Sequence, residues 1–366
     1  MMGSYMASKG LKMLFVGESW NGSSARSLRE ALGEMPDVTM DDIGEDLYFS
    51  KARNLLLQGI SRALNPLQRM ELEQEIRRRL IAFAPDLLMV YKGTNVSADV
   101  IRSAAALGIS TINVFPDCSP HAHGRRLREA VGVYDLVVST KPYHPTSWQC
   151  IYGYENSCVC VPHGYDPKVH YWREPAEEQP LDVVMAAGWR PQYESLMREF
   201  AGATLDLQLR VGLAGPGWER RRQLFPKGWV LPGALQGRSY GEWLRSGKIV
   251  IAPVHADMEV DGVRQPGDQD TTRTYELAAA GCFFLHRRTP FAKMVYDEKS
   301  EVPMWDDATE LAGLVREFLP LNEIRRAMAL KAHYRAVPAY SSVARASQIL
   351  ELATKVVNMK RGDSRK

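Results

Sequence analysis

Short apolar runs alternate with helical patterns through the first half of the chain. The run at 12–17 ends in Gly and is followed by a helical pattern at 23–32. Further strands are expected at 86–91, 109–115, 135–139 and 158–162, with helices at 66–83 and 97–107. Strands that are apolar throughout, joined by helices, indicate a parallel sheet covered on both faces.

The same alternation starts afresh after a break at 171–180, which contains prolines and acidic residues and has no apolar period. Strands are expected at 181–187, 207–212, 248–253 and 282–286, with helices at 193–201, 237–246 and 271–280. From about 306 the pattern is helical, in at least three segments. The break is interpreted as a linker between two doubly wound α/β domains, whose ligands bind beyond the carboxyl ends of the strands.

Composition supports a two-domain globular protein and excludes some classes. The chain has 366 residues with 45% hydrophobic and 24% charged positions, and its net charge of +3 is too small for a nucleic-acid footprint. No apolar run approaches the ~20 residues that span a bilayer, and the first ten residues are interpreted as a loose leader, not a secretory signal. The basic tail at 360–366 is expected to fray. Five cysteines, without zinc-like spacing, suggest reduced thiols in a cytoplasmic protein.

The segment 268–285 is the most informative for chemistry. Thr271 or Thr272 can cap a helix whose first turn carries Arg273 and whose body carries Glu276. Free N–H groups at a helix start and a guanidinium both suit a diphosphate, and a carboxylate can accept the two hydroxyls of a ribose. The alternative from the residues alone is a capped helix with an ordinary surface ion pair.

This segment resembles the donor-binding helix of GT-B glycosyltransferases, in particular the CgeB-like spore-maturation group within glycosyl transferases group 1. The Arg-aromatic-Glu spacing of 273–276, the small residues and the following apolar strand carry the resemblance, and similarity extends over most of 85–350. Asp268 and Glu276 are similar to the pair of acids of the wider family, although the first acid is usually Glu. AspGlnAsp at 268–270 matches a metal-binding DxD pattern formally, but it precedes a helix start of the phosphate-binding type.

The resemblance implies two Rossmann-like domains facing a central cleft. The N-terminal acceptor domain would span 11–170 and the C-terminal nucleotide-sugar donor domain 181–338. The last helix, within 339–366, would cross back to the N-terminal domain. The implied reaction moves a hexose-type sugar from a UDP- or GDP-sugar to an acceptor hydroxyl, without a metal and with no cofactor besides the donor.

Other candidates follow expected strand ends. Gly17 lies in a Gly- and Ser-rich loop, whereas Gly188 and Arg190 follow the first strand of the second domain and would approach the pyrophosphate. Asp117 or His121, after the strand at 109–115, could take the proton of an acceptor hydroxyl. His121 and His123 make a poor metal pair, so no metal site is expected.

The leaving diphosphate would be stabilised by Arg273, Arg190 and the helix start. Retention or inversion, the sugar, the acceptor (a polysaccharide, a small molecule or a modified nucleobase) and the oligomeric state stay open. A nucleotide-sugar epimerase and an inactive nucleotide-sugar binder are the rival hypotheses.

Overall fold

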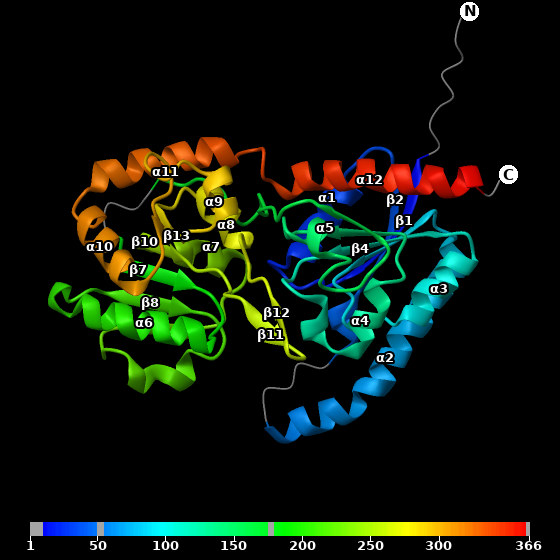
Figure 1. Cartoon of the computed structure of the whole chain (residues 1–366), viewed down its shortest axis with the longest axis horizontal. Coiled ribbons are helices and arrows are strands. Elements are labelled where there is room, and N and C mark those ends of the chain that lie inside the picture. The colour runs from blue at the N-terminus through cyan, green and yellow to red at the C-terminus, as the bar shows by residue number, and fades with distance from the viewer. Residues whose placement is uncertain (1–9, 50–54, 175–178, 364–366) are drawn as a thin grey trace, which may run out of the picture. The chain divides into compact units, whose positions relative to one another are not determined.

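The computed structural model describes residues 10–49, 55–174 and 179–363, which form two compact units (Figure 1). Unit 1 comprises residues up to Pro162, the segment Glu259–Gln265 and the chain from Arg345 onward; unit 2 comprises His163–Met258 and Pro266–Ala344. Most of the expected leader (1–9), part of the expected linker (175–178) and the end of the basic tail (364–366) lie outside the described residues. The boundaries 11–170 and 181–338 stay a prediction.

Unit 1 is built on a six-stranded parallel sheet in the order β2-β1-β3-β4-β5-β6. Its strands are β1 (Leu11–Gly17), β2 (Val38–Gly44), β3 (Leu87–Tyr91), β4 (Ser110–Phe115), β5 (Leu136–Ser139) and β6 (Ser157–Cys160). The strand order reverses between β1 and β3, which is where parallel sheets of this kind leave a crevice beyond their carboxyl ends.

Helices cover both faces of this sheet, as the period-two alternation of its buried strands requires. On β1, Leu14 and Val16 face a cluster formed with α2 (Leu55–Phe83), α3 (Ala98–Ala106) and α4 (Arg125–Val131). Met13 and Phe15 of the same strand face the opposite cluster, formed with α1 (Ser24–Gly33) and α12 (Ser342–Asp363). The short helix α5 (His144–Ser147) follows β5.

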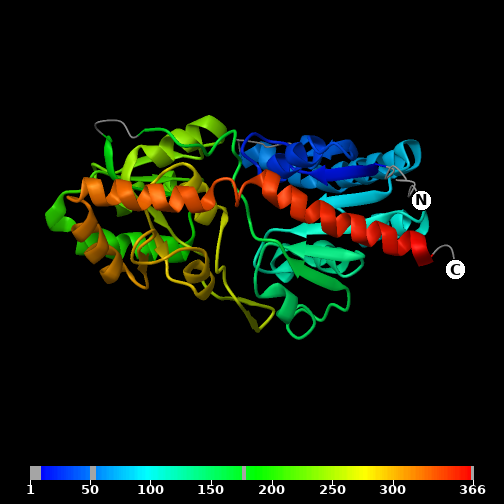
Figure 2. The same ribbon diagram turned by 90° about the horizontal axis from the view of Figure 1, so that it is seen from above.

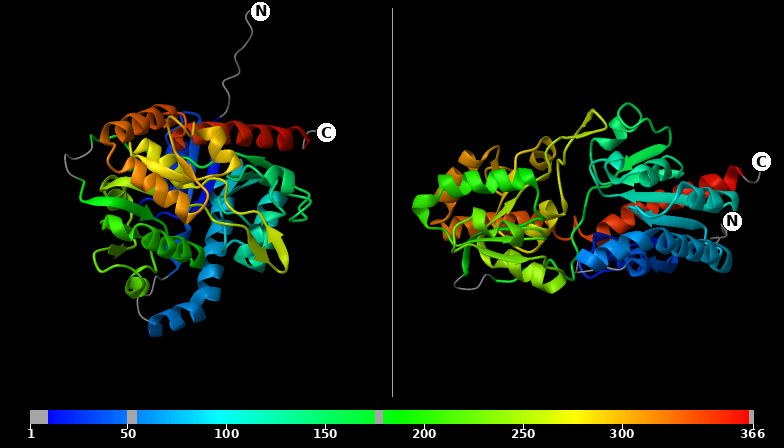
Figure 3. Two further views of the ribbon diagram at one scale, coloured as in Figure 1. Left: turned by 60° about the vertical axis from the view of Figure 1, so that its left-hand side comes forward. Right: turned by 90° about the horizontal axis from the view of Figure 1, so that it is seen from below.

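The C-terminal helix α12 completes the core of unit 1. Ala346, Ile349, Ala353 and Val357 of α12 are buried with the residues of the first sheet. Lys360 and Arg361, near its end, form ion pairs with Asp135 and Asp86. The helix runs along one face of the sheet, as seen from above in Figure 2 and from below in Figure 3. The last helix therefore returns to the N-terminal sheet, as the sequence resemblance implied.

Unit 2 contains a second six-stranded parallel sheet in the order β14-β13-β10-β7-β8-β9. Its strands are β7 (Leu181–Ala186), β8 (Val211–Ala214), β9 (Val230–Gly233), β10 (Gly247–Ala252), β13 (Phe284–Arg287) and β14 (Met304–Trp305). The first strand of the unit, β7, lies in the middle of the sheet, and the order reverses between β7 and β10. This is the strand order of Rossmann-type nucleotide-binding domains, whose ligands lie at that reversal.

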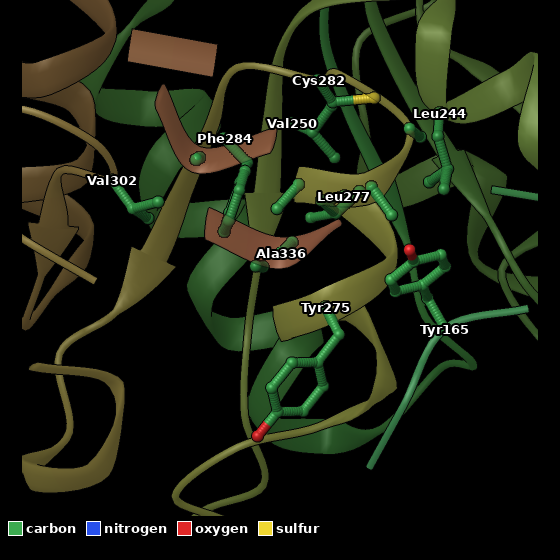
Figure 4. Close-up of a cluster of buried hydrophobic side chains, with 14 of the residues drawn as sticks. Tyr165, Leu244, Val250, Tyr275, Leu277, Cys282, Phe284, Val302 and Ala336 are labelled. Atoms are coloured by element: carbon green, nitrogen blue, oxygen red, sulfur yellow. The ribbon is translucent and has the colours of Figure 1, made fainter. Parts of the chain in front are cut away.

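Two buried clusters sandwich the second sheet. One contains β10 and β13 with α7 (Gly237–Arg245), α8 (Thr272–Ala279), α9 (Pro290–Val295) and α11 (Asn322–Ala336); Figure 4 shows part of it, including Tyr275, Leu277 and Phe284. The other contains α6 (Pro191–Ala203) and α10 (Ala308–Phe318). The three helices α10, α11 and α12 confirm the helical pattern expected beyond residue 306.

Several elements differ from the sequence prediction. The strand expected at 207–212 is wrong in position, because β8 covers Val211–Ala214 and residues 205–207 form a 3₁₀ turn. The helix expected at 66–83 begins at Leu55 and contains Pro66. The strands β2, β9 and β14 and the small pair β11 (Met258–Val260) and β12 (Val263–Gln265) were not expected. These strands are short or half-exposed and lack continuous apolar runs.

We expect Ile349→Ala to destabilise unit 1, because Ile349 is only 3% exposed and its removal leaves a cavity between α12 and the sheet. The expected loss of unfolding free energy is about 2–4 kcal/mol. Denaturant unfolding followed by circular dichroism measures it. Thr354→Ala, at an exposed position of the same helix, is the matched control. An equal effect of the two substitutions would contradict the packing of α12 on the sheet.

Candidate functional site

The first turn of α8 is held by a chain of hydrogen bonds. Thr271 is the N-cap residue, and its backbone N–H donates to the Thr274 hydroxyl at 3.0 Å. The Thr274 hydroxyl lies 2.8 Å from Nε2 of the buried His286, whose Nδ1 lies 2.7 Å from the Arg287 carbonyl. Because a carbonyl only accepts, Nδ1 carries the proton and Nε2 accepts from Thr274. Burial lowers the pKa of His286 to about 4, so its ring is neutral. Both ring nitrogens are hydrogen-bonded.

Arg273 joins α8 to the reversal point of the second sheet. Its guanidinium donates from Nη2 to the carbonyl of Pro253, directly after β10, at 3.1 Å. Its Nε is buried with no hydrogen-bond partner, and the structure records no ion pair for Arg273 among the residues that it describes. The Thr271 hydroxyl is likewise buried without a partner in the described chain. Two unsatisfied polar atoms in one helix turn cost folding free energy, and a ligand with acceptor oxygens would satisfy them.

The other predicted charged residues of unit 2, Arg190 and Asp268, lie near the hydroxyl of Tyr193, as Arg273 does. Burial raises the pKa of Tyr193, on α6, and the charges of Arg273, Asp268 and Arg190 all act on this group. Arg190 is exposed at the N-cap position of α6, immediately beyond β7. Asp268 is half-buried, and its backbone N–H donates to the His255 carbonyl at 2.8 Å. The fold thus brings Arg190 together with Asp268 and Arg273, which lie more than 70 residues further along the sequence.

Glu276 lies one turn after Arg273 and is buried within unit 2. It is 8% exposed, and its Oε2 accepts a 2.8 Å hydrogen bond from the Tyr240 hydroxyl of α7. Its Oε1 lies 4.0 Å from Nε2 of His170, a residue that is 4% exposed. Neither ring nitrogen of His170 has a hydrogen-bond partner in the part of the chain that the structure describes. Burial lowers the pKa of His170. Of the two carboxylate oxygens of Glu276, Oε2 is already bonded to Tyr240.

The remaining predicted glycines and Thr272 differ in what surrounds them. Thr272 is the first residue of α8 and is partly exposed. A Cβ on Gly188 would be 3.6 Å from Pro216, an ordinary contact, so packing does not require glycine there. A Cβ on Gly17 would be 2.9 Å from a Phe15 ring atom and 3.1 Å from the Tyr91 Cβ, so close packing alone accounts for this glycine.

In unit 1 the predicted catalytic carboxylate lies just beyond β4. Asp117 Oδ2 lies 2.7 Å from the Lys92 ammonium and 2.8 Å from Nε2 of His123. Burial alone would raise the pKa of Asp117, but the His123 hydrogen bond and the Lys92 charge outweigh it and hold the pKa well below its usual range. Asp117 therefore stays ionised and has little tendency to accept a proton.

His121 occupies a different environment from Asp117, although only three residues separate them. Its ring packs edge-on against Tyr152 and Tyr154, at centroid distances of 5.4 and 5.8 Å. Burial and the nearby charge of Arg128 lower its pKa. No hydrogen bond or ion pair joins His121 to Asp117 among the interactions of the described residues.

Sequence reasoning missed several partners of the predicted residues. Tyr240 and His170 contact Glu276, His286 supports the start of α8, and Lys92 and His123 contact Asp117. His123 was considered only as part of a metal pair, and Lys92 directly follows the strand expected at 86–91, which is the signal that could have found it. Tyr240 lies mid-helix and His170 in a loop, and no local pattern marks either residue.

Two features are absent from the described residues. They contain no group of three or more His, Cys, Asp or Glu side chains arranged to hold a metal ion. None of their helices is long and apolar enough to cross a bilayer.

Comparisons with known proteins concern one region of the chain and the fold. Residues 192–351, which include α8 with Arg273 and Glu276 but not Arg190, match the family described as glycosyl transferase-like. The structure is similar to sucrose-phosphate synthase from Thermosynechococcus elongatus, with a TM-score of 0.66 and 12% identity over 95% of this chain and 100% of that chain. A comparison with curated proteins gives no match.

Two further solved structures are similar over 94% of this chain and 100% of theirs. HepE from Anabaena, solved in complex with UDP-glucose, has a TM-score of 0.64 and 12% identity. The UDP-GlcNAc 2-epimerase from Neisseria meningitidis, bound to UDP-GlcNAc, has a lower TM-score of 0.54 and 11% identity.

The chain has the GT-B fold of two Rossmann-like domains, as the sequence predicted. Residues 192–351, which match the glycosyl transferase-like family, lie mostly in unit 2, and this match supports a transferase.

We expect the stability of unit 2 to fall with pH below about 6.5, in part because His286 is buried in its neutral form. The folded-state pKa of about 4 lies below the ordinary value of 6.5, so the unfolded chain binds the proton first. The stabilisation is complete above pH 6.5 and is lost as the pH falls toward 4, by roughly 3 kcal/mol for this group.

Denaturant unfolding at pH 7 and pH 4.5 tests this expectation in wild type and His286→Gln. The variant should lose less stability over that interval, whatever its stability at pH 7. Other buried histidines, such as His144 and His170, titrate equally in both proteins and cancel in the difference. Identical pH dependence in the two proteins would show that His286 is not held neutral.

Proposed function

We propose that this protein is a cytoplasmic, metal-independent glycosyltransferase that moves a hexose-type sugar from a UDP- or GDP-sugar to an acceptor hydroxyl. The diphosphate would bind at the carboxyl ends of β7 and β10, and Glu276 would hold the ribose. The loop after β4, which carries Asp117 and His121, would supply the group that takes the acceptor proton. Within the family, the Arg-aromatic-Glu spacing of 273–276 favours the CgeB-like group.

The observation that carries the donor site is the position of Arg273. It lies in the first turn of α8, is bonded to the Pro253 carbonyl at the reversal of strand order, and keeps a buried Nε without a partner among the described residues. Helix N–H groups and a guanidinium donor at this place would form an anion site in which the protein has already met the desolvation cost.

The arrangement suits the charge that develops in sugar transfer. Breaking the bond from the anomeric carbon to the diphosphate leaves negative charge on the phosphate oxygens, and fixed donors lower the barrier. Arg273 and the α8 start would contact those oxygens directly. Arg190, exposed at the start of α6, would add a second cation. Loss of one such donor commonly costs on the order of 10²–10³-fold in rate.

Two other functions use the same donor site. The likeness to the Neisseria meningitidis epimerase favours a nucleotide-sugar epimerase as second candidate, although its TM-score is lower than those of the transferases. A nucleotide-sugar binder without activity is the third. Product analysis with a labelled donor separates them, because transfer or hydrolysis, isomer formation and binding without turnover are distinct outcomes.

We expect UDP or GDP to stabilise the wild-type protein and to stabilise Arg273→Gln and Glu276→Gln far less. At about 100 times its Kd a ligand adds about 2.7 kcal/mol, which raises the melting temperature by several degrees. A thermal-shift panel of nucleoside diphosphates and their glucose conjugates measures this effect, with circular dichroism to verify that each variant is folded.

Arg198→Gln and Glu199→Gln are matched controls, because both residues are exposed on α6. These variants should respond to nucleotide as the wild type does. Equal shifts in Arg273→Gln, Glu276→Gln and the wild type would place the nucleotide elsewhere.

A further inference from the structure

Unit 2 contains a cavity at the end of its sheet opposite to Arg273, which we call the amino-end cavity. Its volume is about 840 Å³. Pro180, directly before β7, and Phe283, directly before β13, line it, as does Lys248, the second residue of β10. The cavity therefore lies at the amino ends of the strands, whereas the candidate donor site lies beyond their carboxyl ends. Strands of six residues, such as β7, separate the two ends by roughly 20 Å.

The lining of the amino-end cavity is strongly cationic. Six basic residues line it, whereas no Asp or Glu of the described chain does. The six are Arg173, Arg210, Arg245, Lys248, Arg325 and Arg326. Asp182, outside the lining, forms ion pairs with Arg210 and Lys248, at 3.3 and 2.8 Å, and Glu174 pairs with Arg326 at 2.5 Å. Two carboxylates do not balance six cations, and a concave surface with excess positive charge attracts anionic ligands.

Two of these arginines share one aromatic ring and have no carboxylate partner. The guanidinium carbon of Arg173 lies 5.0 Å from the centre of the Tyr171 ring, and that of Arg245 lies 5.3 Å from it. Neither arginine forms an ion pair with a residue that the structure describes. Glu242, an acid whose charge interacts with both, is exposed and pairs with Arg238. Two like charges beside one ring repel each other, and an anion bound to both would offset the repulsion.

Hydrogen bonds fix the backbone that carries these cations. The side-chain amide of Gln179 donates to the carbonyls of Arg245 and Gly247, at 3.0 and 2.8 Å, and so joins the end of α7 to the start of β10. Arg325, only 5% exposed, donates to the carbonyl of Phe318 at 2.6 Å and joins the first turns of α11 to the end of α10. A cavity whose walls are fixed before a ligand arrives loses little conformational entropy on binding.

The amino-end cavity also has apolar walls. Trp172, Cys282 and Phe283 belong to its lining. Trp172 packs so closely on Gly281 that a Cβ there would be 2.4 Å from its Cε3 atom, and the Trp172 ring lies 5.0 Å from the ring of His333. The position of the indole is therefore fixed from two sides. Volumes of 300–1,000 Å³ and apolar walls with a few charged groups are typical of sites for small organic ligands.

We propose that the amino-end cavity binds an organic phosphate, a small molecule in which a phosphoryl group is attached to a sugar or a nucleoside. Arg173 and Arg245 would contact the phosphoryl oxygens, because guanidinium groups bind phosphate through paired N–H donors. Trp172 and its apolar neighbours would contact the organic part. Since the cavity lies at the other end of the sheet from the donor site, this ligand would bind together with a nucleotide and would not react. The site goes beyond the proposed function and does not depend on it.

The experiment is isothermal titration of the full chain with glucose 6-phosphate and with AMP, in the presence of saturating UDP, or of GDP if only GDP stabilises the protein. The diphosphate keeps both probes out of the donor site. Inorganic phosphate and glucose are the comparison probes, because each carries one half of the proposed ligand. The variants are Arg245→Gln and Arg173→Gln. Arg238→Gln is the matched control, because Arg238 lies on α7 as Arg245 does, is exposed and does not line the cavity.

We expect at least one of the two organic phosphates to bind the wild type with one-to-one stoichiometry. Its affinity should exceed that of inorganic phosphate by about 10-fold or more, because the apolar walls add contact area, and glucose should not bind. Arg245→Gln and Arg173→Gln should each weaken this binding by about 10–100-fold, the usual effect of removing a charged hydrogen-bond donor. Both variants should keep the wild-type affinity for the nucleoside diphosphate, and Arg238→Gln should keep both affinities. Circular dichroism verifies that each variant is folded.

Several results would overturn this assignment without touching the proposed function. They are absence of binding by both organic phosphates, displacement of the bound diphosphate by the probe, and an equal loss of affinity in Arg238→Gln, which would indicate a general attraction of the surface for anions. Equal affinity for inorganic phosphate would exclude an organic ligand. Failure of UDP and GDP to bind would instead contradict the proposed function, and titration of the organic phosphates without a diphosphate would still test the cavity.

Discussion

The hydrogen bond from Arg273 to the Pro253 carbonyl is the contact on which the candidate donor site depends. It fixes the first turn of α8 against the end of β10, at the place where the order of the second sheet reverses. Glu276 follows three residues later on α8, and residues spaced by three lie on the same side of a helix. The contact of the Arg273 guanidinium with Pro253 therefore helps to fix where the N–H groups of α8 and the buried carboxylate of Glu276 lie.

Support for this contact comes from the side chains of Thr274 and His286. His286 is neutral because burial lowers its pKa, and only the neutral ring can accept the Thr274 hydroxyl while donating to the Arg287 carbonyl. Thr274 in turn accepts the N–H of Thr271. The start of α8 is thus held from the sheet side, which leaves its outer N–H groups for an anion.

The fold was predictable from the sequence where burial dictates the pattern. Strands such as β3, β4 and β10 are buried over most of their length, and Gly or Pro residues near their ends mark the boundaries. The edge strand β2 alternates irregularly between exposed and buried positions, and β14 has only two residues, so neither gives a recognisable period. The error at β8 has a different origin, because Leu207 and Leu209 are apolar but lie before the strand, in the 3₁₀ turn and in the loop that follows it.

The candidate site was predictable in its residue types and less so in its pairings. A helix start followed by Arg and Glu is a local signal, and Arg273 and Glu276 could be singled out from it. The contact of Tyr240 with Glu276 joins residues 36 apart, and that of Lys92 with Asp117 joins the ends of two neighbouring strands. Such pairings depend on strand order and on a left-handed turn at Lys92, which no local propensity favours.

The two units offer opposite electrostatic environments at the ends of their strands. In unit 2, Arg273 and Arg190 form no ion pair among the described residues, and Asp268 is the acid that acts with them on the Tyr193 hydroxyl, so positive charge predominates there. In unit 1, the charge of Lys92 is balanced by Asp117, whose Oδ2 also lies 2.8 Å from Nε2 of His123. Sugar transfer moves negative charge onto a diphosphate and a proton away from an acceptor. An excess of cations suits the first change, so the strand ends of unit 2 carry the charge that a departing diphosphate would require.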